Sequence, residues 1–177
     1  MRVTLTGSSP RRLPERLRYG ALVLAFAGAH VLAQAFAPPE PKLLPPEQAF
    51  KLSARALDPS TIEARFDVAD GYYLYRDRIH FSVGSSGDLP VELPKGQRKH
   101  DEFFGDVETY RGPVLIRVPL PAATPGRTMT LHADSQGCAD VGICYPPNPQ
   151  MVEVALPASG GKPGPYVEAA SRKSWLK

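Results

Sequence analysis

Short runs in which apolar and polar residues alternate recur along most of this chain, and this period of two limits the folds open to it. The runs are residues 50–57, 62–68, 78–83, 114–118, 128–133 and 151–156. Turn-forming segments rich in Pro, Gly, Ser and Asp separate several of them, and the sequence between them has no long helical period. Six or more short strands at this spacing predict an all-β fold, an immunoglobulin-like antiparallel β-sandwich.

The first 35 residues have the three parts of a secretory signal peptide. Four arginines between positions 11 and 18 precede an apolar run at 21–32, and small residues follow it. The run is shorter than the roughly 20 residues that span a bilayer, so we predict cleavage rather than a retained anchor. Cleavage is expected after Ala35 or Ala37, with export to the periplasm by the general secretion route.

The charge of the chain is concentrated in this signal. Residues 1–35 contain five arginines and one glutamate, so their removal lowers the formal charge from +3 to −1. The remaining part has no long run of like charge, which argues against a nucleic acid as partner.

The exported part divides into a lead-in, one domain and a tail. Proline-rich residues 36–47 predict an extended lead-in, because proline fixes φ and removes backbone donors. Residues 48–156 carry the alternating runs and are predicted to form one domain, a monomer by default. Residues 157–177 are expected to be a linker followed by a short helix or an unordered tail.

The two cysteines, Cys138 and Cys144, are separated by five residues and lie in the exported part. An oxidising compartment favours a disulfide if they pair within the chain, with Gly142 supplying the turn. One interpretation is an ordinary structural disulfide. Closing a loop of about seven residues stabilises by only roughly 2.4 kcal/mol, and a short bridge is also suited to thiol exchange.

Other uses of the cysteines fit the sequence less well. The Cys-x-x-Cys spacing of a thioredoxin site is absent. Zinc is disfavoured because two cysteines fall short of four ligands, and His80, His100 and His132 lack metal-site spacing. Copper is disfavoured because Met129 and Met151 are not clustered with histidine. We therefore expect neither metal nor cofactor, and a metal carrier is the least favoured function.

Three separated segments occur in the order found in one known family. They are residues 70–76 (DGYYLYR), 101–105 (DEFFG) and 136–147 (QGCADVGICYPP). Together they resemble the amino-terminal periplasmic domain of the thiol:disulfide interchange protein DsbD, over residues 48–156. That family has an immunoglobulin-like fold, in agreement with the strand pattern. The usual membrane and thioredoxin-like domains do not follow in this sequence, so the expectation is a stand-alone version.

The resemblance implies an enzyme, a protein-disulfide reductase module that relays electrons through a reversible Cys138–Cys144 disulfide without a cofactor. It implies two kinds of partner: thioredoxin-like periplasmic proteins of the disulfide isomerase or cytochrome c maturation type, and a membrane electron donor. Cys144 corresponds to the sulfur that forms mixed disulfides, and Cys138 to the resolving sulfur. The alternative is a non-enzymatic immunoglobulin-like adaptor or chaperone-like binding module with a structural disulfide.

The resemblance also assigns a cap loop and two flanking tyrosines. These residues are Asp101, Glu102, Phe103, Phe104, Gly105, Tyr73 and Tyr75. Phe103 corresponds to an aromatic lid over the sulfurs, although a core phenylalanine beside a turn is the plainer alternative. Tyr73 and Tyr75 share one face of a strand and are expected to line the pocket or to form ordinary cross-strand pairs. Asp101 and Glu102 add negative charge, which would raise the pKa of the thiols.

Overall fold

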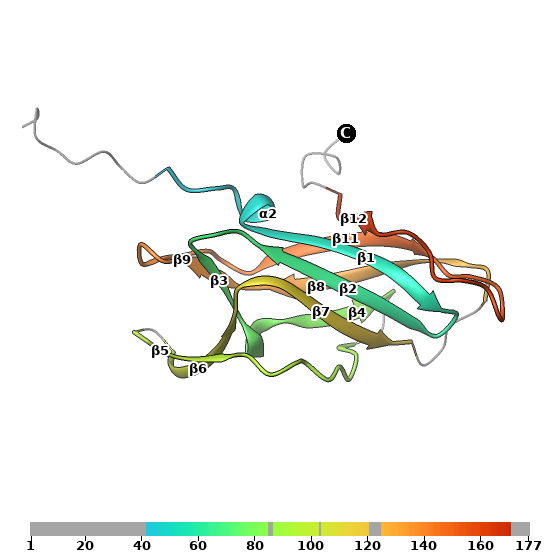
Figure 1. Cartoon of the computed structure of the whole chain (residues 1–177), viewed down its shortest axis with the longest axis horizontal. Coiled ribbons are helices and arrows are strands. Elements are labelled where there is room, and N and C mark those ends of the chain that lie inside the picture. The colour runs from blue at the N-terminus through green and yellow to red at the C-terminus, as the bar shows by residue number, and fades with distance from the viewer. Residues whose placement is uncertain (1–41, 85–86, 103, 121–124, 171–177) are drawn as a thin grey trace, which may run out of the picture. The chain divides into compact units, whose positions relative to one another are not determined.

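The computed structural model describes residues 42–84, 87–102, 104–120 and 125–170. The predicted signal peptide lies outside these residues. Two antiparallel sheets face each other, and a third antiparallel sheet lies at one end of this sandwich (Figure 1). The all-β, immunoglobulin-like sandwich predicted from the alternation is confirmed.

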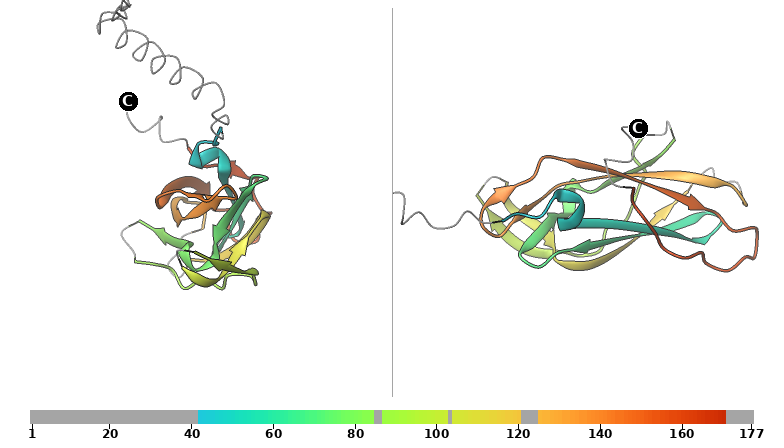
Figure 2. Two further views of the ribbon diagram at one scale, coloured as in Figure 1. Left: turned by 90° about the vertical axis from the view of Figure 1, so that its left-hand side faces the viewer. Right: turned by 90° about the horizontal axis from the view of Figure 1, so that it is seen from above.

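The two facing sheets contain the longest strands. The first has the order β12-β1-β2-β7, formed by Val167–Glu168, Phe50–Asp58, Thr61–Val68 and Gly112–Pro119. The second has the order β11-β8-β4, formed by Asn148–Ala155, Thr128–Ser135 and His80–Val83. Seen from above, β1 and β2 lie in one layer and β8 and β11 in the other (Figure 2).

The third sheet is built from short strands and carries both cysteines. Its order is β10-β9-β3-β6-β5, formed by Ile143–Cys144, Gly137–Ala139, Tyr72–Tyr75, Gly105–Tyr110 and Gln97–Asp101. Two short helical segments complete the described elements: α2 at Pro46–Ala49 and the 3-10 turn η2 at Arg76–Arg78.

The main core fills the space between the two facing sheets. In β7, Val114 and Ile116 point inward and are buried, whereas Leu115 between them is exposed, as a period of two requires. The ring of Phe66 in β2 packs against that of Phe81 in β4, with centroids 6.4 Å apart. Burying such side chains stabilises the fold by about 1.5–3 kcal/mol each, so this apolar contact is a principal link between the layers.

Several strands differ from the sequence-based expectation. The alternation does not predict β3, β5, β6, β9 or β10, and β5 (QRKHD) contains no apolar residue. The run at 78–83 becomes a strand only from His80, since Arg76–Arg78 form the 3-10 turn. Helix α2 begins inside the segment predicted to be an extended lead-in.

The tail also differs from the helix or unordered segment expected there. Val167 and Glu168 form β12, which pairs with Ala54 and Ser53 of β1. The Ala169 N–H donates to a carbonyl of β1, and the following N–H donates to a carbonyl of β11. Edge strands have unpaired backbone N–H and C=O groups. This segment pairs with such groups of β1 in one sheet and of β11 in the other.

Candidate active site

The two cysteines lie opposite each other on a tight hairpin, residues 137–144, here named the cysteine hairpin. Cys138 in β9 and Cys144 in β10 are direct partners in the antiparallel register, with Cα atoms 3.9 Å apart. Their sulfurs form the expected disulfide. Gly142 makes the turn at φ 86°, which favours glycine, and its N–H donates to the Ala139 carbonyl. The predicted turn residue is therefore confirmed.

The two cysteines differ in exposure. Cys138 is 0% exposed, because its strand lies between β3 and β10 and its sulfur faces buried tyrosines. Cys144 is partly exposed, on the strand at the edge of the sheet. In the intact fold, a reagent from solvent can reach Cys144 more readily than Cys138.

Gly137 allows β9 to lie close to its neighbours. A Cβ atom at this position would come within 2.2 Å of the Tyr73 carbonyl oxygen and 2.7 Å of the Phe50 ring. The first contact is to backbone, so a side chain here would force the strands apart. Phe50 belongs to the main core, and the cysteine hairpin is therefore packed directly against it.

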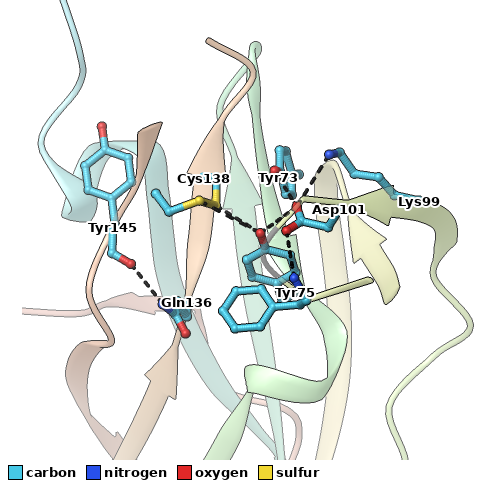
Figure 3. The surroundings of a disulfide bond; sticks show 9 residues. Tyr73, Tyr75, Lys99, Asp101, Gln136, Cys138 and Tyr145 are labelled. Carbon is cyan, nitrogen blue, oxygen red and sulfur yellow. Dashed lines mark hydrogen bonds and ion pairs between the residues drawn. A yellow bond between two sulfur atoms is a disulfide. The ribbon is translucent and has the colours of Figure 1, made fainter. Parts of the chain in front are cut away.

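Two tyrosines of β3 form the floor beside the sulfurs. Tyr73 and Tyr75 lie on one face of the strand, with their rings edge to face at 5.5 Å. The Tyr75 hydroxyl oxygen is 3.1 Å from Cys138 Sγ and 3.9 Å from Cys144 Sγ (Figure 3). Burial, and then the hydrogen bond to Asp101, raise the pKa of Tyr75, so its hydroxyl keeps its proton at neutral pH.

Asp101 joins these tyrosines to the loop between β5 and β6. Its residue exposure is only 3%, and its Oδ2 accepts hydrogen bonds from Tyr75 (2.7 Å) and Tyr73 (3.1 Å). Lys99 Nζ lies 3.5 Å from the same oxygen. The other oxygen, Oδ1, accepts the Phe104 N–H at 3.3 Å. One buried carboxylate thus connects the loop, the tyrosine floor and, through Tyr75, the disulfide.

Phe104 lies in the loop between β5 and β6, and it is 39% exposed. Its ring meets Tyr75 edge to face at 5.0 Å, and the Arg78 guanidinium lies 4.7 Å from its centroid. Glu102 is exposed, and Gly105 begins β6 with φ 70°. Phe103, the predicted lid, lies outside the described residues.

A salt bridge fixes the turn of the cysteine hairpin from outside. Arg111 donates two hydrogen bonds to the Asp140 carboxylate, at 2.5 and 3.0 Å, and a third to the Tyr72 carbonyl at 3.1 Å. The hydrogen bond from Arg111 lowers the pKa of Asp140. The hairpin is therefore joined to the start of β3 on this side.

The structure brings most of the predicted site residues together. Both cysteines, both tyrosines, Asp101 and Phe104 form one connected cluster, whereas Glu102 points to solvent. Sequence reasoning missed three cations: Arg78, Lys99 and Arg111. Only Lys99 had a local signal, because it lies two residues before Asp101 on the same strand face.

No group of three or more His, Cys, Asp or Glu side chains within the described ranges is arranged to hold a metal ion. Met151 is the register partner of His132 in the ladder of β8 and β11. One such pair falls short of a usual donor set. Among the described residues, no helix is long and apolar enough to cross a membrane.

A β-sandwich with a disulfide on a hairpin at one end, one sulfur buried and the other partly exposed, fits a domain of the thiol:disulfide interchange class. The sequence model of one family, described as thiol:disulfide interchange protein DsbD, N-terminal, matches residues 40–156. The chain belongs to this family of DsbD amino-terminal domains.

Similar proteins agree with this assignment. The chain is 41% identical to the DsbD of Ralstonia nicotianae over 98% of its own length, and 33% identical to that of Escherichia coli over 84%. It spans only 28% and 26% of those two relatives.

Two solved structures from Neisseria meningitidis have the same fold. The DsbD amino-terminal domain in its reduced form matches with a TM-score of 0.59 and 31% identity, over 72% of this chain and 96% of that one. A complex between the DsbD and PilB amino-terminal domains matches with a TM-score of 0.52 and 35% identity, over 64% and 88%.

Proposed function

We propose that this chain is a periplasmic protein-disulfide reductase module that relays electrons through a reversible Cys138–Cys144 disulfide. The observation that carries the proposal is a buried Cys138 paired with a partly exposed Cys144, with the Tyr75 hydroxyl beside both sulfurs. Such a pair can react through one sulfur while the other remains in reach.

The proposed exchange begins with the reduced pair. The Cys144 thiolate attacks one sulfur of an oxidised partner, forming a mixed disulfide and releasing the partner's other sulfur as a thiolate. The Cys138 thiolate then attacks Cys144 Sγ, which restores the intramolecular disulfide and releases the partner's second thiolate. Two electrons pass to the partner, and exchange with a donor dithiol returns the chain to the reduced form. The roles of the two sulfurs follow their exposures.

Asp101 is proposed to keep the reduced pair unreactive until a partner binds. Its carboxylate lies one hydrogen-bonded hydroxyl away from Cys138, and negative charge near a thiol disfavours the thiolate. In Asp101→Asn we expect the pKa of the thiols to fall by about one unit. Alkylation rate against pH measures this change, with Asp106→Asn as a control because Asp106 is an exposed carboxylate on β6, the strand that pairs with β5. An unchanged thiol pKa in Asp101→Asn would refute this role.

The cap loop, residues 101–105, is proposed to shield the sulfurs, with Phe103 as the lid. Support comes from the anchoring of this loop on Asp101 and from the contact of Phe104 with Tyr75. Phe103→Ala is expected to accelerate oxidation of the reduced pair by small disulfides, and Phe104→Ala to do so less. Equal rates in Phe103→Ala and the parent chain would contradict the lid.

The proposed partners are oxidised thioredoxin-like proteins of the disulfide isomerase or cytochrome c maturation type, with a membrane-linked donor. Three exposed apolar side chains lie on the cysteine hairpin and cap loop: Val141 (59%), Ile143 (41%) and Phe104 (39%). Exposed apolar groups around a reactive centre suit a transient protein contact. The complex of a related DsbD domain with the PilB amino-terminal domain supports a protein as the partner.

The reduction potential of the purified domain, measured in a dithiothreitol or glutathione buffer series, tests the function directly. A relay is expected to lie well above about −300 mV, the range below which structural disulfides fall. The fold should persist in the reduced form. A potential in the structural range, or unfolding on reduction, would favour the non-enzymatic adaptor with a structural disulfide.

Trapping identifies the attacking sulfur. Cys138→Ser should accumulate a mixed disulfide with an oxidised thioredoxin-like partner, because the resolving sulfur is absent. Cys144→Ser should accumulate far less, because the remaining sulfur is buried. Equal trapping by the two variants would contradict the proposed roles.

A further inference from the structure

The chain just before α2 contacts β3 and the residue that follows the cysteine hairpin. Residues 42–45, here named the amino-terminal strap, contact two tyrosines through the backbone of Leu44. The Leu44 N–H donates to the Tyr72 hydroxyl at 2.8 Å, and the Tyr145 hydroxyl donates to the Leu44 carbonyl at 2.7 Å. Both backbone groups of one strap residue are therefore paired with side chains far away in the sequence.

Each of the two tyrosines lies near one cysteine of the disulfide, either in the sequence or across the sheet. Tyr145 directly follows Cys144. Tyr72 begins β3 and precedes Tyr73, which is the register partner of Cys138. The strap therefore holds one residue beside each of the two strands that carry the sulfurs.

Tyr145 is fixed by its backbone and its ring as well as by its hydroxyl. Its N–H donates to the Gly137 carbonyl at 2.9 Å, and its carbonyl accepts from Gln136 Nε2 at 3.2 Å (Figure 3). Its ring packs edge to face on Phe50 at 5.5 Å and lies 6.2 Å from the Tyr72 ring. Burial raises the pKa of Tyr145 to about 12, so the hydroxyl remains a donor at neutral pH. The chain leaving Cys144 is thus held in one place, and the strap supplies the hydroxyl's partner.

We infer that the strap is a positioning element of the exchange site, acting on Cys144 through Tyr145. The inference rests on the proposed function, in which Cys144 is the sulfur that attacks. With the strap in place, Cys144 stays beside the Tyr75 hydroxyl and only partly exposed. Release of the strap lets the segment after Cys144 move. Cys144 Sγ then becomes accessible to reagents other than the partner protein. Cys138, by contrast, is contacted by the Tyr75 hydroxyl, which donates to Asp101.

Alkylation of the reduced full chain tests this inference. The rate constant at Cys144 with iodoacetamide is measured by mass spectrometry in the parent chain, Tyr145→Phe and Tyr72→Phe. Each variant keeps its ring and loses one hydrogen bond to Leu44. We expect the rate at Cys144 to rise about two- to tenfold, the factor that corresponds to one ordinary hydrogen bond. Hydrogen exchange of the Tyr145 amide should accelerate in parallel.

Tyr110→Phe is the matched control. The Tyr110 hydroxyl also donates to a backbone carbonyl, that of Pro94, but on β6 and outside the strap. This variant should leave the Cys144 rate and the Tyr145 amide unchanged. The inference is overturned if Tyr145→Phe alkylates at the parent rate, or if Tyr110→Phe raises the rate equally, which would indicate general loosening.

Failure of the strap's role and failure of the proposed relay give different results. A reduction potential in the structural range, with faster alkylation only in the strap variants, would reject the relay and keep the strap as the element that positions Cys144. A relay potential with unchanged alkylation would reject the strap's role and keep the relay.

Discussion

The main core and the cluster beneath the disulfide are both buried, but they are built from different chemistry. The main core joins two sheets through apolar side chains such as Phe66 and Phe81, and contact area rather than direction determines its stability. The smaller cluster buries Tyr73, Tyr75 and Cys138 around a carboxylate, and directional hydrogen bonds determine its arrangement. The comparison teaches that stability and sulfur chemistry reside in separable regions of one small domain.

A substitution in the main core gives the largest expected effect and the clearest test of this separation. Phe66→Ala is expected to lower the free energy of unfolding by about 3–5 kcal/mol, because it removes a fully buried ring and leaves a cavity. The reduction potential should stay at the parent value. Guanidinium unfolding and a redox buffer series measure the two quantities. The control is Leu115→Ala on the exposed side of β7, and a shifted potential in Phe66→Ala would break the comparison.

Reduction of the disulfide is expected to have the next largest effect. It should lower the free energy of unfolding by roughly 2.4 kcal/mol, since the bridge closes a loop of about seven residues. The sheets should persist, in keeping with the related Neisseria domain, which has been solved in its reduced form. Circular dichroism and guanidinium unfolding with and without reductant measure this. The double variant Cys138→Ser, Cys144→Ser should match the reduced chain, and loss of the fold in either would make the disulfide structural.

Within the smaller cluster, two tyrosines whose hydroxyls both donate to Asp101 sharpen the comparison. Tyr73→Phe and Tyr75→Phe each remove one hydrogen bond to Asp101 and should each cost about 1 kcal/mol of stability. Of these two hydroxyls, that of Tyr75 contacts the sulfurs, so Tyr75→Phe rather than Tyr73→Phe should change the reduction potential and the thiol pKa. Parallel unfolding and redox measurements on both variants decide this. Equal potentials would mean that the hydroxyl plays no part in tuning the disulfide.

The response to acid is expected to be smaller than these effects. Hydrogen bonds from Tyr166 and Arg55 lower the pKa of Glu63 on β2. Because the folded-state pKa lies below that of the unfolded chain, this stabilisation is complete above about pH 5 and is lost as pH falls through the folded-state value. Unfolding midpoints between pH 6 and pH 2 should therefore fall less steeply in Glu63→Gln.

Asp140 gives the matching test at the cysteine hairpin. Its pKa is also lowered, by Arg111, but its side chain is 46% exposed, so solvent weakens the pair. Asp140→Asn should therefore change global stability less than Glu63→Gln. A larger effect of Asp140→Asn on the unfolding midpoint would show that the hairpin and the main sheets unfold as one unit.

The sequence predicts the main core better than the site, for a physical reason. Strands that bury one face against a large core must alternate, so β2 and β7 are visible in the sequence. β5 has no apolar residue, and its Asp101 is buried only because tyrosines 26 and 28 residues earlier reach it. Motif resemblance supplied the residues of that cluster, but no local pattern predicts a contact such as Tyr145 with Leu44, which are 101 residues apart.

The amino-terminal strap and β12 also determine how the domain would bear mechanical force. The curated relatives are longer chains, of which this one spans about a quarter. Tension arriving through residue 42 would load the Leu44 hydrogen bonds and pass to Tyr145, which directly follows Cys144. Tension arriving through residue 170 would load the edge pairing of β12 with β1, where no cysteine lies. Tension at residue 42 would therefore perturb the surroundings of Cys144, whereas tension at residue 170 would first detach β12 from β1.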